Sequence, residues 1–456
     1  MDLNQARIAI RQANIASEKS VVSRMLAATG LSAAARTRIV AEAEAMVESL
    51  RADPAPNLME SFLAEYGLST DEGVALMCLA EAYLRVPDAP TLDALIRDKI
   101  GGADWSRHTG EAGSFLVNAS TWALMLTGSI FRDGAISEAE LVGNLRNLIQ
   151  RVGEPFVRAA VAQAMRVLGQ QFVLGRTIED AIRRGDKDRQ AGYRFSFDML
   201  GEAAMTEADA RRYFLAYSRA ISAIAEQATS AAVHDNPGIS VKLSALHPRY
   251  EFTQHGRLMD ELVPRLAALA EMARNANIGF SIDAEEADRL ELSLDVIEAV
   301  ASNADLAGWD GFGMVVQTYA KQSLPVLEWI RALAERHDRH FAVRLVKGAY
   351  WDMEIKHAQV LGLPAYPVFT RKTSTDVAYL AGARFLFDNA DRLYPQFATH
   401  NAHTACAVLE MAGDVSAFEF QRLHGMGEAL HAGLHETADR NIRIYAPVGV
   451  HEDLLA

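Results

Sequence analysis

The stretch that decides the fold is Val343-Arg344-Leu345-Val346-Lys347-Gly348-Ala349-Tyr350-Trp351-Asp352. Together with Phe341 it begins as a buried parallel strand, because its first residues are mostly apolar and partly β-branched. Arg, Lys, Gly, Tyr, Trp and Asp then gather at the carboxyl end of this strand. A core strand has no use for such a cluster, since unpaired buried cations cost several kcal/mol. An anionic cofactor with an aromatic ring would use arginine donors, a lysine charge and a glycine that lets the backbone approach closely.

Short apolar segments of this kind alternate with amphipathic helices from Tyr193 onward. The pattern predicts eight strands, at residues 193–199, 238–246, 279–285, 311–319, 340–348, 366–372, 396–401 and 418–423. Eight such units indicate an α/β protein with a (β/α)8 TIM-like barrel. A doubly wound open sheet is the alternative. The barrel is preferred because of the strand count and because no glycine-rich phosphate fingerprint follows the first strand.

The residues before the barrel read as an all-helical region. Apolar residues recur at helical spacing in 73–86, 136–151 and 154–175, and the polar segment 185–193 resembles a boundary. We therefore predict a helical arm and linker region over 1–190 and a barrel over 191–456. The last residues, 450–456, resemble the first turns of an eighth barrel helix. We expect most of that helix to be missing and the chain to be a fragment.

Composition narrows the class of protein. The chain has 456 residues, half of them hydrophobic, with a formal net charge of -14 and no basic block, which argues against nucleic acid as a partner. Two cysteines, Cys78 and Cys406, favour a reducing compartment. The N-terminus has no signal-peptide core, and no apolar run is long enough to span a bilayer. These features predict a cytoplasmic protein and are compatible with peripheral contact at the inner membrane.

Polar residues stand at the carboxyl end of almost every predicted strand, where a barrel of this kind carries its active site. They include Asp198, Glu202, Lys242, Asp283, Glu285, Glu286, Gln317, Tyr319, Arg344, Lys347, Arg371, Lys372, Thr399, His400, Asn401, Gln421 and His424. Any one of them is equally well explained as a rim ion pair or a helix cap. Solvation of loops, however, does not require a charged residue at the end of so many successive strands. The polar residues taken together therefore indicate a functional site.

Metal binding and Schiff-base formation are two other chemistries that these residues could support. His400 and His403 resemble half of a zinc site, but no second pair accompanies them, so we predict no metal. Lys242 or Lys347 could form a Schiff base. The residues Arg344, Tyr350 and Trp351 fit a bulky planar cofactor better.

Seven motifs in order resemble the proline dehydrogenase part of bacterial proline utilization A. The resemblance is strong over about residues 190–456 and less specific over the helical region. The motifs are FDMLGEAA (197–204), SVKLSALHPRY (240–250), IDAEEADRL (282–290), RLVKGAYWD (344–352), FATHNAHT (397–404), LHGMGE (423–428) and IYAPVG (444–449).

This resemblance implies a distorted barrel that holds FAD and oxidises L-proline to Δ1-pyrroline-5-carboxylate. Hydride would pass to flavin N5 and electrons to a membrane quinone. The catalytic and substrate residues would be Lys242, Asp283, Arg344, Tyr350, Tyr445 and Glu202. The cofactor residues would be Gln317, Arg344, Val346, Lys347, Gly348, Ala349, Trp351, Thr370, Lys372, Thr399, His400, Asn401, Gln421 and Leu423.

The sequence departs from this family at its end. Two arginines that bind the proline carboxylate stand on the family's eighth helix, beyond Ala456, where they would pair with Glu202 and Asp283. We expect neither the family's aldehyde dehydrogenase nor its ribbon-helix-helix DNA-binding head in this chain. A homo-oligomer formed through the N-terminal helices is compatible with the sequence. The alternatives are a catalytically impaired flavin-binding fragment, or another flavin barrel enzyme such as a methylenetetrahydrofolate reductase.

Overall fold

The computed structural model describes residues 2–52, 90–91, 172–438 and 440–450. Of these, residues 2–52, 172–438 and 440–450 belong to one compact unit. The helices predicted at 73–86 and 136–151 lie outside the described residues, as does all but the end of the segment 154–175.

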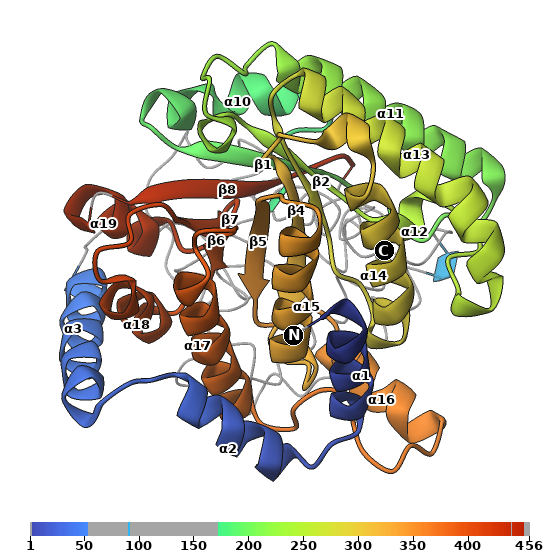
Figure 1. Ribbon diagram of the computed structural model, residues 1–456. Helices are drawn as coiled ribbons and strands as arrows, with labels where there is room; N and C mark the ends of the chain where they lie inside the picture. Colours follow the sequence, from blue (N-terminus) through green and yellow to red (C-terminus); the bar gives the residue numbers. More distant parts are fainter. Residues whose placement is uncertain (1, 53–89, 92–171, 439, 451–456) are drawn as a thin grey trace. The chain divides into compact units, whose positions relative to one another are not determined.

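The described residues form a closed barrel of eight parallel strands that follow one another in chain order, with β8 pairing back to β1 (Figure 1). This confirms the predicted (β/α)8 fold. The strands are β1 (Arg194–Met199), β2 (Gly238–Val241), β3 (Gly279–Ile282), β4 (Phe312–Gln317), β5 (Phe341–Val346), β6 (Leu393–Ala398), β7 (Glu419–Leu423) and β8 (Asn441–Val448).

Helices precede the barrel and connect its strands. They are α1 (Leu3–Asn14), α2 (Glu18–Ala28), α3 (Ala33–Ala52), α10 (Ile178–Gln190), α11 (Glu207–Ala225), α12 (Leu243–Leu246), α13 (His255–Asn275), α14 (Leu290–Ala301), α15 (Ser323–Arg336), α16 (Trp351–Val360), α17 (Lys372–Asp388), α18 (Ala402–Ala412) and α19 (Glu428–Ala438). The described part of the region 1–190 is therefore helical, as predicted.

One predicted strand is wrong. Residues 366–372 do not join the barrel; they form an extended connection in which Val368 makes an isolated antiparallel bridge to Ala320. The segment is rich in β-formers, but its backbone pairs with the chain that follows β4: Phe369 N donates to the carbonyl oxygen of Tyr319 at 2.8 Å, and Lys321 N donates to that of Pro367 at 3.1 Å. The eighth strand is instead β8, in the segment that contains the motif IYAPVG. The predicted strand 238–246 is also too long, because β2 ends at Val241 and α12 follows.

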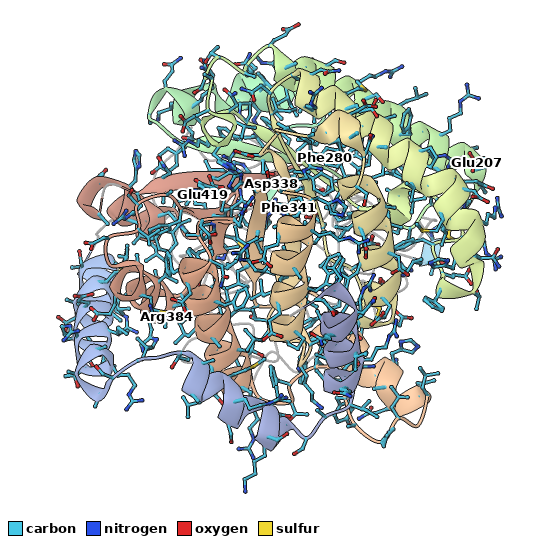
Figure 2. The ribbon with its side chains drawn as sticks, viewed as in Figure 1. Glu207, Phe280, Asp338, Phe341, Arg384 and Glu419 are labelled. Atoms are coloured by element: carbon cyan, nitrogen blue, oxygen red, sulfur yellow. The ribbon has the colours of Figure 1, made fainter. Side chains whose placement is uncertain are left out.

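The alternation of side chains along β5 explains how the barrel buries both of its faces. Phe341, Val343 and Leu345 are fully buried in the main hydrophobic core, and Phe341 is labelled in Figure 2. Ala342 and Arg344 alternate with them and point to the opposite face, since successive side chains of a strand alternate. The apolar face thus packs outward under the helices while Arg344 enters the barrel.

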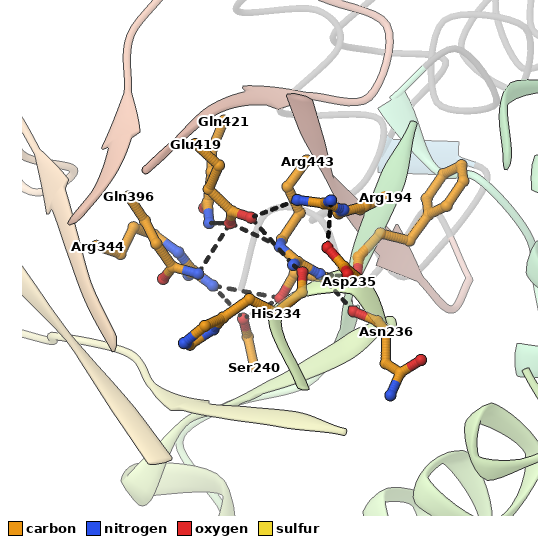
Figure 3. A network of polar contacts seen from close by, with 12 residues as sticks. Arg194, His234, Asp235, Asn236, Ser240, Arg344, Gln396, Glu419, Gln421 and Arg443 are labelled. Carbon is orange, nitrogen blue, oxygen red and sulfur yellow. Dashed lines mark hydrogen bonds and ion pairs between the residues drawn. The ribbon is translucent and has the colours of Figure 1, made fainter. Parts of the chain in front are cut away.

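The barrel interior contains a buried ionic network near its amino end (Figure 3). Glu419 Oε1 accepts from Arg443 Nε at 2.6 Å, and from the side-chain amides of Gln396 and Gln421, both at 2.8 Å. Burial works against the charge of Glu419, but the Arg443 guanidinium lowers the carboxyl pKa. Arg443 also donates to the carbonyl oxygen of Asn236 at 3.0 Å. The network therefore ties strands from opposite sides of the barrel together.

The three N-terminal helices pack against the outer helices of the barrel: α1 contacts α15, α2 contacts α17 and α3 contacts α18 (Figure 1). Arg7 of α1 donates to Glu291 Oε2 at 3.2 Å. Arg384 of α17, which is labelled in Figure 2, donates to the carbonyl oxygen of Thr29 at 3.3 Å. The start of the chain is thus part of the barrel's outer layer.

Candidate active site

Lys242 and Asp283 form the centre of a charged cluster at the carboxyl ends of the first strands. Lys242 Nζ lies 2.8 Å from Asp198 Oδ1 and 3.3 Å from Asp283 Oδ2. The hydroxyl of Tyr445 donates to Asp283 Oδ2 at 2.8 Å. Burial opposes the charge of Lys242, but the carboxylate of Asp198 holds its pKa well above the usual value. One ammonium is therefore shared between two buried carboxyl groups, and burial raises the pKa of Asp198.

Arg344 joins this cluster to the barrel interior. Its Nη1 donates to Asp283 Oδ1 at 2.8 Å. Its Nη2 donates to Ser240 Oγ at 2.8 Å, and Figure 3 labels these two residues. The guanidinium carbon lies 4.8 Å from the ring centre of Tyr445. Among the described residues, Arg344 Nε is buried and has no hydrogen-bond partner. Arg344 is therefore held by Asp283 and keeps one unused donor.

Glu202 and Tyr350 stand beside this cluster without joining its hydrogen bonds. Glu202 makes no hydrogen bond or ion pair with the described residues, and burial raises its pKa to about 7, against the opposing charge of Lys242. Burial and the charge of Glu202 raise the pKa of the Tyr350 hydroxyl. Glu202 can consequently change its protonation state near neutral pH.

Two of the predicted cofactor lysines converge on a single carboxylate. Lys347 Nζ lies 2.5 Å from Asp376 Oδ1, and Lys372 Nζ lies 3.0 Å from Asp376 Oδ2. Lys347 also donates to Thr404 Oγ1 at 3.2 Å. Burial lowers the pKa of Lys347, and the charge of Asp376 opposes this effect. Two ammonium groups with one carboxylate leave a positive balance that suits a phosphate.

The loop after β5 packs its backbone directly against the ring of Tyr319 at Gly348. Gly348 has a φ of +151°, and a Cβ there would lie 2.3 Å from Cγ of Tyr319. Only glycine avoids that collision. The N–H of Ala349 donates to Gln317 Oε1 at 3.0 Å, and Trp351 Nε1 donates to the carbonyl oxygen of Phe369 at 2.8 Å.

The ends of β6 and β7 bring further predicted residues together. Leu423 N donates to His400 Nε2 at 3.0 Å. Because burial lowers the pKa of His400, the neutral ring carries its proton on Nδ1, which is then a donor. Asn401 caps α18 by accepting from Thr404 N, and Asn401 N donates to Thr399 Oγ1 at 3.2 Å. Gln421 Oε1 is buried and has no partner among the described residues.

These residues fit a large anionic cofactor. Lys347 and Lys372 offer positive charge, and two buried polar atoms, Arg344 Nε and Gln421 Oε1, are without partners in the described part of the chain. The carbonyl oxygen of Val346 accepts from Thr318 N at 2.8 Å, which ties the end of β5 to the residue after β4. The structure thus brings the residues predicted on β4 to β7 to one end of the barrel. Which of them contact FAD remains a prediction.

Three side chains of this site were not assigned a role from the sequence. Asp198 was recognised as one of many strand-end acids, but its bond to Lys242 depends on the register of β1 and β2. Asp376 lies one helical turn after Lys372, and this i,i+4 spacing is the sequence signal that could have revealed the pair. Glu18 binds the predicted cofactor residue Thr370 from 352 positions away, and no local sequence signal reveals that contact.

Other features of the described residues lie away from this end of the barrel. A cavity of about 430 Å³ opens at the amino ends of β2 to β4, lined by residues 231–234 and 307–310. No group of three His, Cys, Asp or Glu side chains in the described ranges is placed to hold a metal ion. No helix in these ranges is long and apolar enough to cross a membrane.

Comparison with known proteins identifies two families along the chain. The family described as "Proline dehydrogenase" matches residues 181–456, and the one described as "DNA-binding domain of Proline dehydrogenase" matches residues 58–172. The second description stands against our expectation that nucleic acid is not a partner. Almost all of residues 58–172 lie outside the described residues.

Curated relatives and solved structures agree with the first match. The bifunctional protein PutA of Escherichia coli (strain K12) is 50% identical over 407 residues, which are 88% of this chain and 31% of that protein. PutA of Rhizobium meliloti is 49% identical and covers 92% of this chain and 34% of its own length. The chain thus spans about a third of the length of these relatives. Proline utilization A of Bradyrhizobium japonicum superposes with a TM-score of 0.72 at 50% identity, covering 97% of this chain and 44% of that one.

Proposed function

The chain belongs to the proline dehydrogenase family, and from that premise we propose that it oxidises L-proline to Δ1-pyrroline-5-carboxylate with FAD as its cofactor. The observation that supports this best is the cluster of Lys242, Asp283, Arg344 and Tyr445, next to the residues expected to hold the cofactor. When bound, FAD would supply the hydride acceptor and a one- or two-electron carrier.

The charges of the cluster suit a zwitterionic substrate. Lys242 and Arg344 offer cations to a carboxylate, while Asp283 and Glu202 offer acidic groups to an amine. Because these groups are largely buried, their interactions with a small ligand are less screened than on the surface. The arrangement can therefore orient proline by its two charged ends.

Individual residues have distinct parts in this proposal. Asp283 holds Arg344 and Tyr445 in fixed positions through its two oxygens, which limits their motion. The cation of Arg344 would stabilise negative charge that develops on the cofactor. The carboxyl group of Glu202, with a pKa of about 7, can accept and hold the proton that the substrate's amine releases. Tyr350 would pack its ring on the substrate.

The remaining cofactor contacts are proposed from the site's geometry and the family. Lys347 and Lys372 would face phosphate groups, with Thr370 and Asn401 nearby, and the donor Nδ1 of His400 would meet an oxygen. We further propose a quinone as the electron acceptor, with a cytoplasmic protein that contacts the inner membrane peripherally. The net charge of -14 argues against nucleic acid as a partner, whereas the family match over residues 58–172 argues for it.

The cofactor assignment is tested by titrating FAD into the folded protein and following the flavin absorbance and fluorescence. We expect saturable binding of one FAD. The variant Arg344→Met should keep FAD but slow its reduction by proline more than it lowers FAD content, since a cation acts mainly when charge develops. A folded protein that binds no FAD contradicts the proposal. Bound flavin that is reduced by a nicotinamide but not by proline would favour a reductase instead.

A further inference from the structure

The first turn of α2 reaches across to the start of α17. Glu18 Oε2 accepts hydrogen bonds from Thr370 N at 3.1 Å and from Thr370 Oγ1 at 2.9 Å. Its other oxygen, Oε1, accepts from Ser374 Oγ at 2.9 Å. Burial works against the charge, but these bonds from Thr370 lower the pKa of Glu18. A single carboxylate therefore satisfies three donors at the beginning of α17.

Further contacts hold the start of α2, and with it Glu18, against the barrel. Lys321 Nζ donates to the carbonyl oxygen of Ala16 at 2.9 Å, just before α2. Val21 and Met25 of α2 form a small buried cluster with Phe369, which precedes Thr370. Figure 1 shows α2 running beside the lower end of α17. The position of Glu18 is thus fixed by packing as well as by its own hydrogen bonds.

The segment around Thr370 is also tied to the candidate cofactor site on its other side. Phe369 N donates to the carbonyl oxygen of Tyr319 at 2.8 Å, and Trp351 Nε1 donates to the carbonyl oxygen of Phe369 at 2.8 Å. Thr370 therefore lies between the N-terminal helices and the end of β5. A change at Glu18 can therefore alter the position of Thr370, which is bonded to it and is itself an expected cofactor residue.

We propose that Glu18 is a positioning residue for the cofactor, which fixes the Thr370 hydroxyl as a hydrogen-bond acceptor. A hydroxyl has one proton, and Thr370 donates it to Glu18, so only its lone pairs remain free. Thr370 would then accept from a ribose hydroxyl or an amino group rather than donate to a phosphate. This inference rests on the proposed FAD function, because it takes Thr370 as a cofactor contact.

An opposite role for Glu18 makes a contrasting prediction. Backbone N–H and hydroxyl donors at a helix start also suit a phosphate, so the carboxylate could fill an anion site that the cofactor would otherwise occupy. In that case removing Glu18 would strengthen FAD binding. If Glu18 positions Thr370, its removal weakens FAD binding.

The test measures how fast FAD leaves the loaded full chain, from the recovery of flavin fluorescence after dilution. Loss of a hydrogen bond to a charged group should make release about tenfold faster in Glu18→Ala, and less so in Glu18→Gln, which keeps an acceptor. The control is Arg38→Gln, which removes an ion pair from α3 to Glu410 on α18 and does not touch Thr370. Its release rate should match the unmodified chain.

A double variant separates positioning from general loosening. In a Thr370→Val background the added Glu18→Ala change should have little further effect, because Glu18 acts through the Thr370 hydroxyl. Slower release in Glu18→Ala, additive effects in the double variant, or equal acceleration by Arg38→Gln would overturn the inference. An unchanged release rate would overturn it while leaving the FAD proposal intact. Absence of FAD binding by the unmodified chain would overturn both.

Discussion

Replacing Lys242 by methionine should destabilise the barrel in a way that depends on pH. Lys242 is bonded to Asp198 at 2.8 Å and to Asp283 at 3.3 Å, and all three side chains are at least 86% buried, with exposed fractions of 14%, 6% and 10%. Asp283 keeps Arg344 at 2.8 Å and the Tyr445 hydroxyl at 2.8 Å. Asp198 is therefore the carboxyl group that loses its ion-pair partner when Lys242 is replaced.

The magnitude follows from the two options open to Asp198 in the variant. Removing the partner of a buried charge typically costs about 3–5 kcal/mol. Taking up a proton instead costs about 4 kcal/mol at pH 7, because the ordinary aspartate pKa is about 3.9 and each unit is worth about 1.4 kcal/mol. At pH 5 the same proton uptake costs only about 1.5 kcal/mol. We expect the unfolding free energy to fall by about 3 kcal/mol at pH 7 and by about half of that at pH 5.

The direction of this pH dependence follows from the linkage between protonation and folding. In the variant, the folded pKa of Asp198 lies above its unfolded value, so the folded state binds the proton more tightly. The destabilisation is then absent below the unfolded pKa and grows as the pH rises toward the folded pKa. Urea unfolding at both pH values, followed by circular dichroism, measures it. The variant Lys242→Met with Asp198→Asn should recover most of the loss at pH 7. Equal losses at both pH values, or no recovery, would refute the reasoning.

Three further outcomes are expected. Burial raises the pKa of Glu202 to about 7, above its unfolded value, so Glu202 lowers the stability of the fold as the pH rises from about 4.5 to about 7. In Glu202→Gln the melting temperature should therefore depend less on pH over this range and be higher at pH 8. An unchanged pH profile would contradict the raised pKa. Gly348→Ala places a Cβ 2.3 Å from Cγ of Tyr319 at a φ of +151°, so it should lower the free energy of unfolding by about 1–3 kcal/mol and reduce the FAD content. An unchanged melting temperature and flavin content would show that the loop adapts. Arg443→Met removes the nearer of two ion-pair partners from buried Glu419 and leaves Arg194 at 4.0 Å, so it should cost about 3 kcal/mol in urea unfolding. Adding Glu419→Gln should recover part of this loss, and a much smaller loss would mean that Arg194 alone compensates the carboxylate.

Sequence reasoning recovered the barrel because most of its strands are short buried runs between amphipathic helices. The run from Phe341 to Val346 is the clearest example, since its apolar residues alternate with Ala342 and Arg344. The segment 366–372 was misassigned because its composition is that of a strand while its pairing is a single bridge. The strand β8 was not counted, since it carries the buried Arg443 and ends near Pro447.

The position of these side chains at one end of the barrel was predictable from the sequence, but their pairings were not. The acids and bases at the strand ends are visible in the sequence, because the barrel places those positions at one end. Which of them pair depends on strand register, as in the bond from Lys242 to Asp198. Contacts between distant segments, such as Glu18 with Thr370, carry no periodicity and appear only when the helices are packed.

The central claim is tested most directly by adding L-proline to the FAD-loaded protein without oxygen and following the flavin absorbance. The account predicts that the absorbance of the oxidised flavin disappears as proline is added, and that Arg344→Met, which keeps its FAD, is reduced far more slowly. A bound flavin that stays oxidised in excess proline, yet is readily reduced by dithionite, would contradict the claim that this site oxidises proline.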